Sequence, residues 1–211
     1  MFHNRITAGY ELASRLKKFR DGDGVVMAIP RGGVPVGYVV AKELNLPLSL
    51  ALVKKIGHPG NKEYAIGAAS LADSYVIPHE GVSSGYIDAT VARVRERLQE
   101  MQHTYQDHSR QEPLSGRTVI IVDDGIATGN TLLATVEMLR RERPSKIVVA
   151  VPVASREAFL QLSDAADEIV CLRVPEVFWG VGAFYEDFHQ VTDHQVIFYL
   201  RKLREQHNER V

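Results

Sequence analysis

The chain has 211 residues, of which 45% are hydrophobic and 24% are charged, a composition typical of a globular domain. Its formal net charge of −1 excludes the broad positive surface by which many proteins hold nucleic acid or an anionic membrane, so we expect neither as a partner. The single cysteine, Cys171, excludes an intrachain disulfide and a cysteine-rich zinc site.

The first residues, Met1 to Arg5, lead directly into an amphipathic pattern. They lack the basic segment and apolar run of a signal peptide, and no stretch of the sequence approaches the roughly 18 apolar residues of a membrane span. We therefore expect a cytoplasmic protein.

Helical and extended patterns alternate from the beginning of the chain. Apolar residues at helical spacing predict helices over 6–19 and 34–44. Short apolar runs predict buried strands over 25–29 and 48–53. Residues 54–62 contain two glycines, one proline and three lysines, which predicts a mobile loop.

That loop begins an insertion of about residues 54–110. Residues 66–69 and 75–77 are expected to pair as a small antiparallel hairpin, and a long helix is predicted over 84–108. The helix has a one-sided apolar stripe, which is typical of a helix on a surface or at a subunit contact. We expect one domain over 1–211, with the insertion forming a small hood.

The second half of the chain has the clearest strand-helix alternation. It predicts strands over 118–122, 146–151 and 168–172, and helices over 130–141, 156–162 and 193–203. The fold class is therefore α/β, a parallel twisted sheet with helices on both faces and a ligand site at the carboxyl ends of the strands. The polar tail from Arg204 is expected to be loose.

The segment 122–131 reads VDDGIATGNT and joins a predicted strand to a predicted helix. Gly125 and Gly129 allow a tight turn and a close approach of the backbone to a ligand. Free N–H groups at the start of the helix would then face an anion, and Thr128 and Thr131 add hydroxyl donors. An ordinary strand-to-helix turn is the alternative, but two consecutive acids exceed what a helix cap requires.

Asp123 and Asp124 would repel a bound phosphate, so they need another role. Carboxylates suit sugar hydroxyls, a hydrated Mg²⁺ or a positive charge that develops beside the phosphate. We expect the pair to lie at an exposed loop.

Two further segments have the composition of anion-binding loops. Pro30-Arg31-Gly32-Gly33 follows the first predicted strand, and Arg31 offers a fork of donors that matches phosphate oxygens. The predicted loop 54–62 is basic and could close over a polyphosphate through Lys54 or Lys55. A simple turn and a solvated run of charge are the respective alternatives.

The segment 122–131 resembles the signature by which type I phosphoribosyltransferases bind phosphoribosyl pyrophosphate (PRPP), four apolar residues followed by D-D-x-x-x-T-G-x-T. With the three apolar residues that precede it, Val119 to Ile121, it matches this pattern along its whole length. The alternation of strands and helices from residue 25 to residue 172 agrees with the same family. The chain looks most like members described only as predicted phosphoribosyltransferases, whose substrate is unassigned. A Walker P-loop is excluded because G-x-x-x-x-G-K-[ST] is not present.

The resemblance implies an enzyme that uses Mg²⁺ to transfer the phosphoribosyl group of PRPP to a nucleobase or similar nucleophile, with release of pyrophosphate. By that resemblance Asp123 and Asp124 hold the ribose hydroxyls and, through water, the metal. Arg31, Gly32 and Gly33 bind pyrophosphate, assisted by Lys54 or Lys55. The cradle for the 5-phosphate consists of Ala127, Thr128, Gly129, Asn130 and Thr131.

The acceptor is less well defined than the donor. In related enzymes that salvage 6-oxopurines, the position of Ala127 is typically an aspartate that handles a proton of the purine, so this chemistry is put in doubt here. Phe178 and Trp179 follow the last predicted strand of the sheet and could stack on a heterocycle, although packing or an interface would explain them equally well.

Two further expectations come from the resemblance. Relatives often hold a cis peptide in the pyrophosphate loop, so we predict a cis or otherwise unusual bond between Pro30 and Arg31. Relatives are usually dimers, so we expect a homodimer. The same fold also serves regulators that bind PRPP or a nucleotide with little catalysis, and this remains the alternative function.

Overall fold

The computed structural model describes residues 1–109 and 111–208. Its centre is a five-stranded sheet in the order β2-β1-β6-β7-β8, in which every neighbouring pair is parallel. The strands are β1 (Gly24–Ala28), β2 (Leu48–Leu50), β6 (Thr118–Val122), β7 (Lys146–Val153) and β8 (Glu168–Arg173). The predicted parallel sheet is confirmed.

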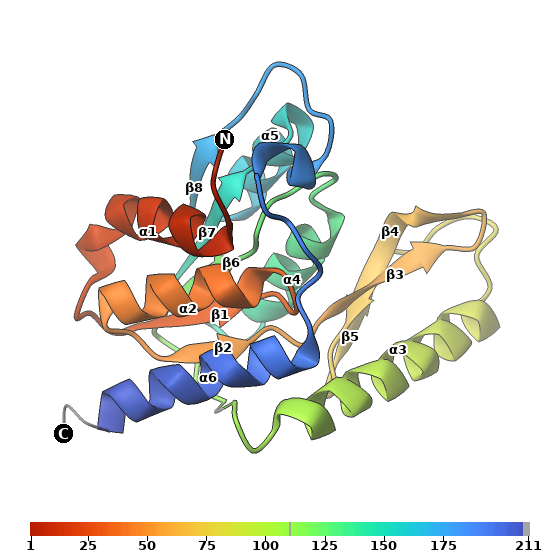
Figure 1. Cartoon of the computed structure of the whole chain (residues 1–211). Helices are drawn as coiled ribbons and strands as arrows, with labels where there is room; N and C mark the ends of the chain where they lie inside the picture. Colours follow the sequence, from red (N-terminus) through yellow and green to blue (C-terminus); the bar gives the residue numbers. More distant parts are fainter. Residues whose placement is uncertain (110, 209–211) are drawn as a thin grey trace.

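Helices cover both faces of this sheet, as predicted (Figure 1). One face is covered by α1 (Arg5–Arg15), α2 (Gly33–Leu44) and α6 (Asp193–Asn208), and the other by α4 (Asn130–Arg140) and α5 (Arg156–Ala165). Side chains alternate between the two cores along each strand, because successive residues of a strand point to opposite faces. In β6, Ile120 packs on the α2 side and Ile121 on the α4 side. Two short 3₁₀ helices, η1 (Lys17–Phe19) and η2 (Val181–Phe184), lie outside the sheet.

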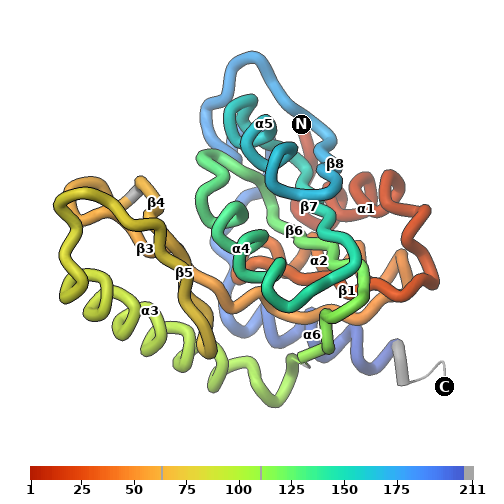
Figure 2. Tube along the Cα trace, turned by 180° about the vertical axis from the view of Figure 1, so that it is seen from behind, coloured from red at the N-terminus to blue at the C-terminus, as the bar shows by residue number. Residues whose placement is uncertain are grey.

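A second unit, here called the arm, projects to one side of the sheet in both views (Figures 1 and 2). It consists of the antiparallel strands β3 (Lys54–His58), β4 (Asn61–Ala69) and β5 (Ser74–Val76) and the long helix α3 (Ser84–Tyr105). One contact of the arm with the rest of the protein is at α4. Arg141 Nη1 lies 2.6 Å from Asp73 Oδ2, and Ala68 packs against Ala134 and Met138. Among the described residues, no helix is both long and apolar enough to cross a membrane.

The prediction of a loop over 54–62 is wrong, because residues 54–58 form β3 and pair with β4 across a tight turn. Ile56 is completely buried with Ile66 and Ala69 beneath α3, and this burial stabilises the strand. A single buried apolar residue among lysines and glycines left no alternating pattern in the sequence, and the register shifts beside Gly57 interrupt the strand further.

The chain after residue 203 also differs from its prediction. α6 continues to Asn208, so the part of the tail that the structure describes is helical rather than loose. Arg204 Nη1 donates to the carbonyl of Asp107 at 2.8 Å, which holds this last turn against the segment that follows α3. That segment is not helical, since α3 ends at Tyr105 and not at residue 108. Residues 209–211 lie outside the described part of the chain.

Candidate functional site

The three predicted ligand segments meet at the carboxyl ends of neighbouring strands. β1 and β6 pair in register, with Ala28 opposite Val122, so the loops that follow them lie side by side. The amide of Ile29 donates to the carbonyl of Val122 at 2.9 Å and continues this pairing beyond β1. The structure therefore brings Pro30-Arg31-Gly32-Gly33 against the paired acids.

Close contact between these two loops explains the two glycines. A Cβ atom at position 32 would overlap Asp124 Oδ2, and one at position 33 would lie 2.9 Å from the Cα atom of Asp123. Only glycine fits both positions without displacing an acid. The peptide bond between Pro30 and Arg31 is cis, and this prediction is confirmed.

The two acids are more enclosed than predicted. The side chain of Asp124 is only 13% exposed and Asp123 is half-buried, so the expectation of an exposed loop is wrong. Burial raises the pKa of both carboxyl groups, and the charge of Asp124 raises the pKa of Asp123 further. Asp123 Oδ1 also accepts a hydrogen bond from the amide of Asp124 at 2.9 Å, which fixes the first carboxylate.

Arg5 and the segment before α6 enclose the second acid. Arg5 Nε donates to Asp124 Oδ2 at 2.8 Å, and its Nη1 donates to the carbonyl of His189 at the same distance. The guanidinium stacks 3.9 Å above the ring of Phe188, and the hydroxyl of Tyr185 donates to the carbonyl of Asp124 at 2.6 Å. Opposite charge lowers the pKa of Asp124 and partly offsets its burial.

Sequence reasoning missed Arg5 and Tyr185. Arg5 and Asp124 are 119 residues apart, and neither Arg5 nor Tyr185 belongs to a recognisable motif. Only the fold brings them together, through the pairing of the backbone of Phe2 with that of Tyr185.

The loop of the VDDGIATGNT segment leads into the N-terminus of α4. Gly129 has a left-handed backbone (φ 75°), and the described residues provide no side-chain cap for this helix. The start of α4 thus has no side chain of Gly129 over it, an arrangement that suits an anion at the helix N-terminus. Ala127 and Thr128 are exposed. Ser155, the N-cap of α5, donates from Oγ to the carbonyl of Ala127 at 2.7 Å and holds the loop in place.

A basic region lies beside these loops, where the arm begins. Lys54 and Lys55 line a cavity of about 280 Å³ together with Pro30 and Thr131. Burial lowers the pKa of Lys54, and the nearby positive charges of Arg97 and Arg31 lower it further. The structure thus brings Arg31 and both lysines to one side of the paired acids.

The aromatic residues proposed for base stacking lie in the segment between β8 and η2. Phe178 stacks on Phe184 with ring centroids 5.7 Å apart, whereas Trp179 leaves 84% of its surface exposed. From the same part of the chain, Val181 packs closely against Gly125, where a Cβ atom would overlap it. This segment therefore shapes the loop after the acids, and the ring of Phe178 is already engaged in packing.

Comparison with known proteins agrees with the architecture of this site. The sequence profile of a family described as the phosphoribosyl transferase domain matches residues 7–189. Over 205 residues the chain is 38% identical to a Mycobacterium tuberculosis protein that is named, provisionally, as a phosphoribosyl transferase. That alignment covers 95% of this chain and 46% of the relative, so the chain spans about half the length of the curated relatives it matches.

Solved structures that resemble this fold include proteins from Thermus thermophilus and Aquifex aeolicus. The protein TT1426 from Thermus thermophilus is 38% identical and superimposes with a TM-score of 0.89, covering 96% of this chain and 98% of its own. The AQ2163 protein from Aquifex aeolicus is 17% identical, with a TM-score of 0.50 over 81% of this chain and 74% of its own. The second likeness concerns the fold alone.

Proposed function

The chain belongs to the phosphoribosyl transferase family, and from this premise we propose that it transfers the phosphoribosyl group of PRPP to a nitrogenous base or similar nucleophile and releases pyrophosphate. The observation that carries the proposal is the convergence of three unlike groups at one sheet edge. Two enclosed acids, the helix N-terminus that follows Gly129 and the loop with Gly32 and Gly33 meet there.

The reaction exchanges one bond at the anomeric carbon of the ribose. The bond to the pyrophosphate oxygen breaks, and a bond to the acceptor nitrogen forms as that nitrogen loses its proton to water. Positive charge develops on the ribose in between, and the carboxylates of Asp123 and Asp124 are suited to stabilise it. The amides of residues 128–131 would hold the 5-phosphate, so that the sugar is fixed at both ends.

The leaving group needs positive charge. Arg31 can present a fork of donors to pyrophosphate, and we propose Lys54 rather than Lys55 as its partner. Lys54 lies close enough to Arg31 for the charge of Arg31 to lower the pKa of Lys54. Both side chains can therefore bind the same anion. Removing a single such donor from a transition state costs on the order of 3 kcal/mol.

The acids are also suited to hold Mg²⁺. Both present oxygen atoms, which this ion prefers, and the raised pKa of Asp123 reflects buried negative charge that a cation would compensate. When bound, the ion would neutralise the departing pyrophosphate. We propose that Asp123 and Asp124 contact it through water.

Binding and turnover test the proposal separately. PRPP with Mg²⁺ is titrated calorimetrically into the protein, and a panel of free bases is then screened for release of pyrophosphate, with a protein-free control. The double variant Asp123→Asn, Asp124→Asn is expected to bind PRPP weakly and to show no transfer. Unchanged PRPP affinity in this variant would refute the assignment of the acids.

A regulator that binds PRPP or a nucleotide with little catalysis is the second candidate function. The ion pair between Arg5 and Asp124 favours it, because one of the two acids already has a partner within the protein. Tight PRPP binding without release of pyrophosphate for any base in the panel would support this interpretation over the enzyme.

A further inference from the structure

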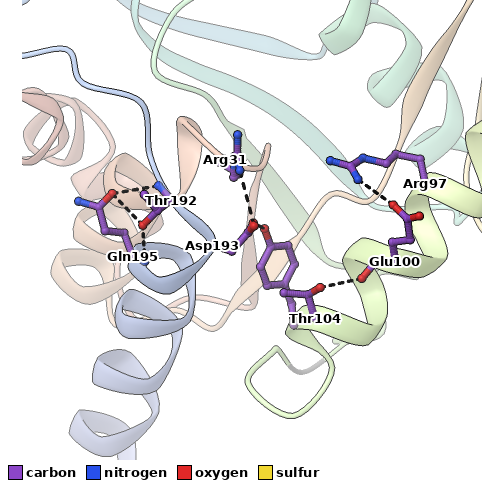
Figure 3. Close-up of polar contacts among 8 residues, drawn as sticks. Arg31, Arg97, Glu100, Thr104, Thr192, Asp193 and Gln195 are labelled. Carbon is purple, nitrogen blue, oxygen red and sulfur yellow. Dashed lines mark hydrogen bonds and ion pairs between the residues drawn. The ribbon is translucent and has the colours of Figure 1, made fainter.

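Arg31 faces a carboxylate that does not belong to either ligand loop. Its Nη1 atom lies 3.6 Å from Oδ2 of Asp193, at the start of α6 (Figure 3). This distance allows charge attraction but is too long for a hydrogen bond. Asp193 can therefore orient the guanidinium while leaving its donors to another acceptor, and the Arg31 side chain is still 34% exposed.

The carboxylate of Asp193 is not needed to cap its own helix. The amide of Thr192 donates to Oε1 of Gln195 at 3.0 Å, and the amide of Gln195 donates to Oγ1 of Thr192 at 3.2 Å. These reciprocal bonds cap the start of α6 (Figure 3). Asp193 is thus free to face away from α6, toward Arg31 and the arm.

Tyr105 fixes the other oxygen of this carboxylate. It is the last residue of α3, it is 2% exposed, and its hydroxyl donates to Oδ1 of Asp193. Burial and the charge of Asp193 raise the pKa of Tyr105, so the hydroxyl remains a donor. The ring is held by the core beneath α2 and α6, which gives the hydroxyl a rigid base.

We infer that Asp193 is a positioning residue for Arg31, and that Tyr105 in turn fixes Asp193, so that the guanidinium is aimed at the pyrophosphate end of the site. This inference rests on the proposed function, in which Arg31 binds the leaving group. A side chain with several rotatable bonds loses less entropy on binding when it is already held in place. The contact also makes the pyrophosphate loop depend on the arm helix α3.

The direction in which anion affinity changes when the Asp193 carboxylate is removed distinguishes a positioning role from a purely electrostatic one. Removing a carboxylate near an anion site should strengthen anion binding if only charge matters. Removing a positioning residue should weaken it, although the site becomes more positive. Asp193→Asn keeps the size of the side chain, and Tyr105→Phe removes only the hydroxyl.

The test is a pair of calorimetric titrations, one with Mg-pyrophosphate and one with ribose 5-phosphate, which occupies only the phosphate and ribose end. In Asp193→Asn the dissociation constant for Mg-pyrophosphate should rise about tenfold, and that for ribose 5-phosphate should stay within about twofold. Tyr105→Phe should show a smaller change in the same direction. The double variant should be no weaker than Asp193→Asn, because the hydroxyl acts through the carboxylate. Asp164→Asn, at an exposed position of α5, is the matched control and should change neither constant.

Each other result counts against the inference in a distinguishable way. Unchanged or tighter Mg-pyrophosphate binding in Asp193→Asn overturns it, as does an equal loss for both ligands, which would indicate general damage. If Arg31→Ala loses affinity for Mg-pyrophosphate while Asp193→Asn keeps it, the proposed function survives and the inference alone fails. If the unaltered protein binds neither ligand, both fail together.

Discussion

At Gly32 the requirement for glycine comes from a neighbouring side chain and not from the backbone. Its φ of −59° is accessible to any residue, but a Cβ atom would overlap the carboxylate of Asp124. The sequence showed two adjacent glycines and suggested exposed N–H groups. It could not show that Gly32 makes room for an acid from the neighbouring loop, because that contact exists only once β1 and β6 pair.

Gly32→Ala should therefore damage both the fold and the site. Overpacking of this kind costs about 1–3 kcal/mol, and displacement of Asp124 should weaken PRPP binding as well. Urea unfolding and PRPP titration measure the two effects. Gly85→Ala in α3 is the control, because a Cβ atom there meets nothing within 4 Å, and it should be neutral or slightly stabilising.

Asp123→Asn alone should make the protein more stable at neutral pH. A carboxyl group whose pKa is raised on folding destabilises the native state once the pH exceeds its ordinary value of about 3.9, and the full penalty is present above the raised pKa. An amide in its place removes this penalty and can still accept from the amide of Asp124. A gain of about 1 kcal/mol would raise Tm by roughly 2–4 °C at pH 7.

Thermal unfolding across pH checks this expectation. The gain should disappear below about pH 4, where the native carboxyl group is protonated in both states. Asp167→Asn is the opposite control, since hydrogen bonds from Arg140 and the amide of Ile147 lower the pKa of Asp167. That variant should lose stability at pH 7. A lower Tm for Asp123→Asn at pH 7 would contradict the prediction.

Among the elements, α5 supports the loop before α4, a role that its own sequence does not indicate. Its N-cap, Ser155, accepts from the amide of Ala158 at 3.1 Å and donates to the carbonyl of Ala127 at 2.7 Å. One hydroxyl therefore starts a helix and supports the loop that leads into α4. A serine before a helix predicts the first function, but the second depends on the pairing of β6 with β7.

Ser155→Ala should cost about 1 kcal/mol in the free energy of unfolding and should also weaken binding of ribose 5-phosphate. The matched variant is Ser83→Ala, which removes the N-cap of α3 and has no contact with the phosphate loop. We expect Ser83→Ala to lower stability alone. Equal ribose 5-phosphate affinity in the unaltered protein, Ser155→Ala and Ser83→Ala would show that Ser155 acts only as a helix cap.

The predictability of each element follows from how much of its stabilisation is local. The buried parallel strands appear as apolar runs, and the motif after β6 identified the loop and the start of α4 from ten consecutive residues. β3 gave no such signal, because Ile56 alone is fully buried in it and the remaining stabilisation comes from pairing with β4. Contacts such as Arg5 with Asp124, or Asp193 with Arg31, depend on three-dimensional structure throughout.

At the scale of the whole molecule, the arm has a smaller core than the five-stranded sheet. Its fully buried cluster consists of Ile56, Ile66 and Ala69, whereas large clusters cover both faces of the parallel sheet. Local opening is easier where fewer apolar contacts must be broken.

The expected homodimer stays a prediction, to be checked by light scattering.

Amide hydrogen exchange should reveal this difference in stability. We expect the amides of β3–β5 to exchange faster than those of β1, β6 and β7. Mg-pyrophosphate should slow exchange over residues 54–56 more than over β5, because Lys54 lies beside Arg31 at the ligand cavity. Protection spread evenly over the arm, or confined to α5, would contradict this expectation.

The contact between Gly32 and Asp124 also has an evolutionary consequence. Two positions far apart in the chain form one unit of selection, since any side chain at position 32 competes for the space of the acid. A lineage that keeps the acid for ribose binding must keep the glycine, whereas a lineage that has abandoned turnover can lose both. Among relatives of this protein, the residue at the position of Gly32 should therefore indicate whether phosphoribosyl transfer is still under selection.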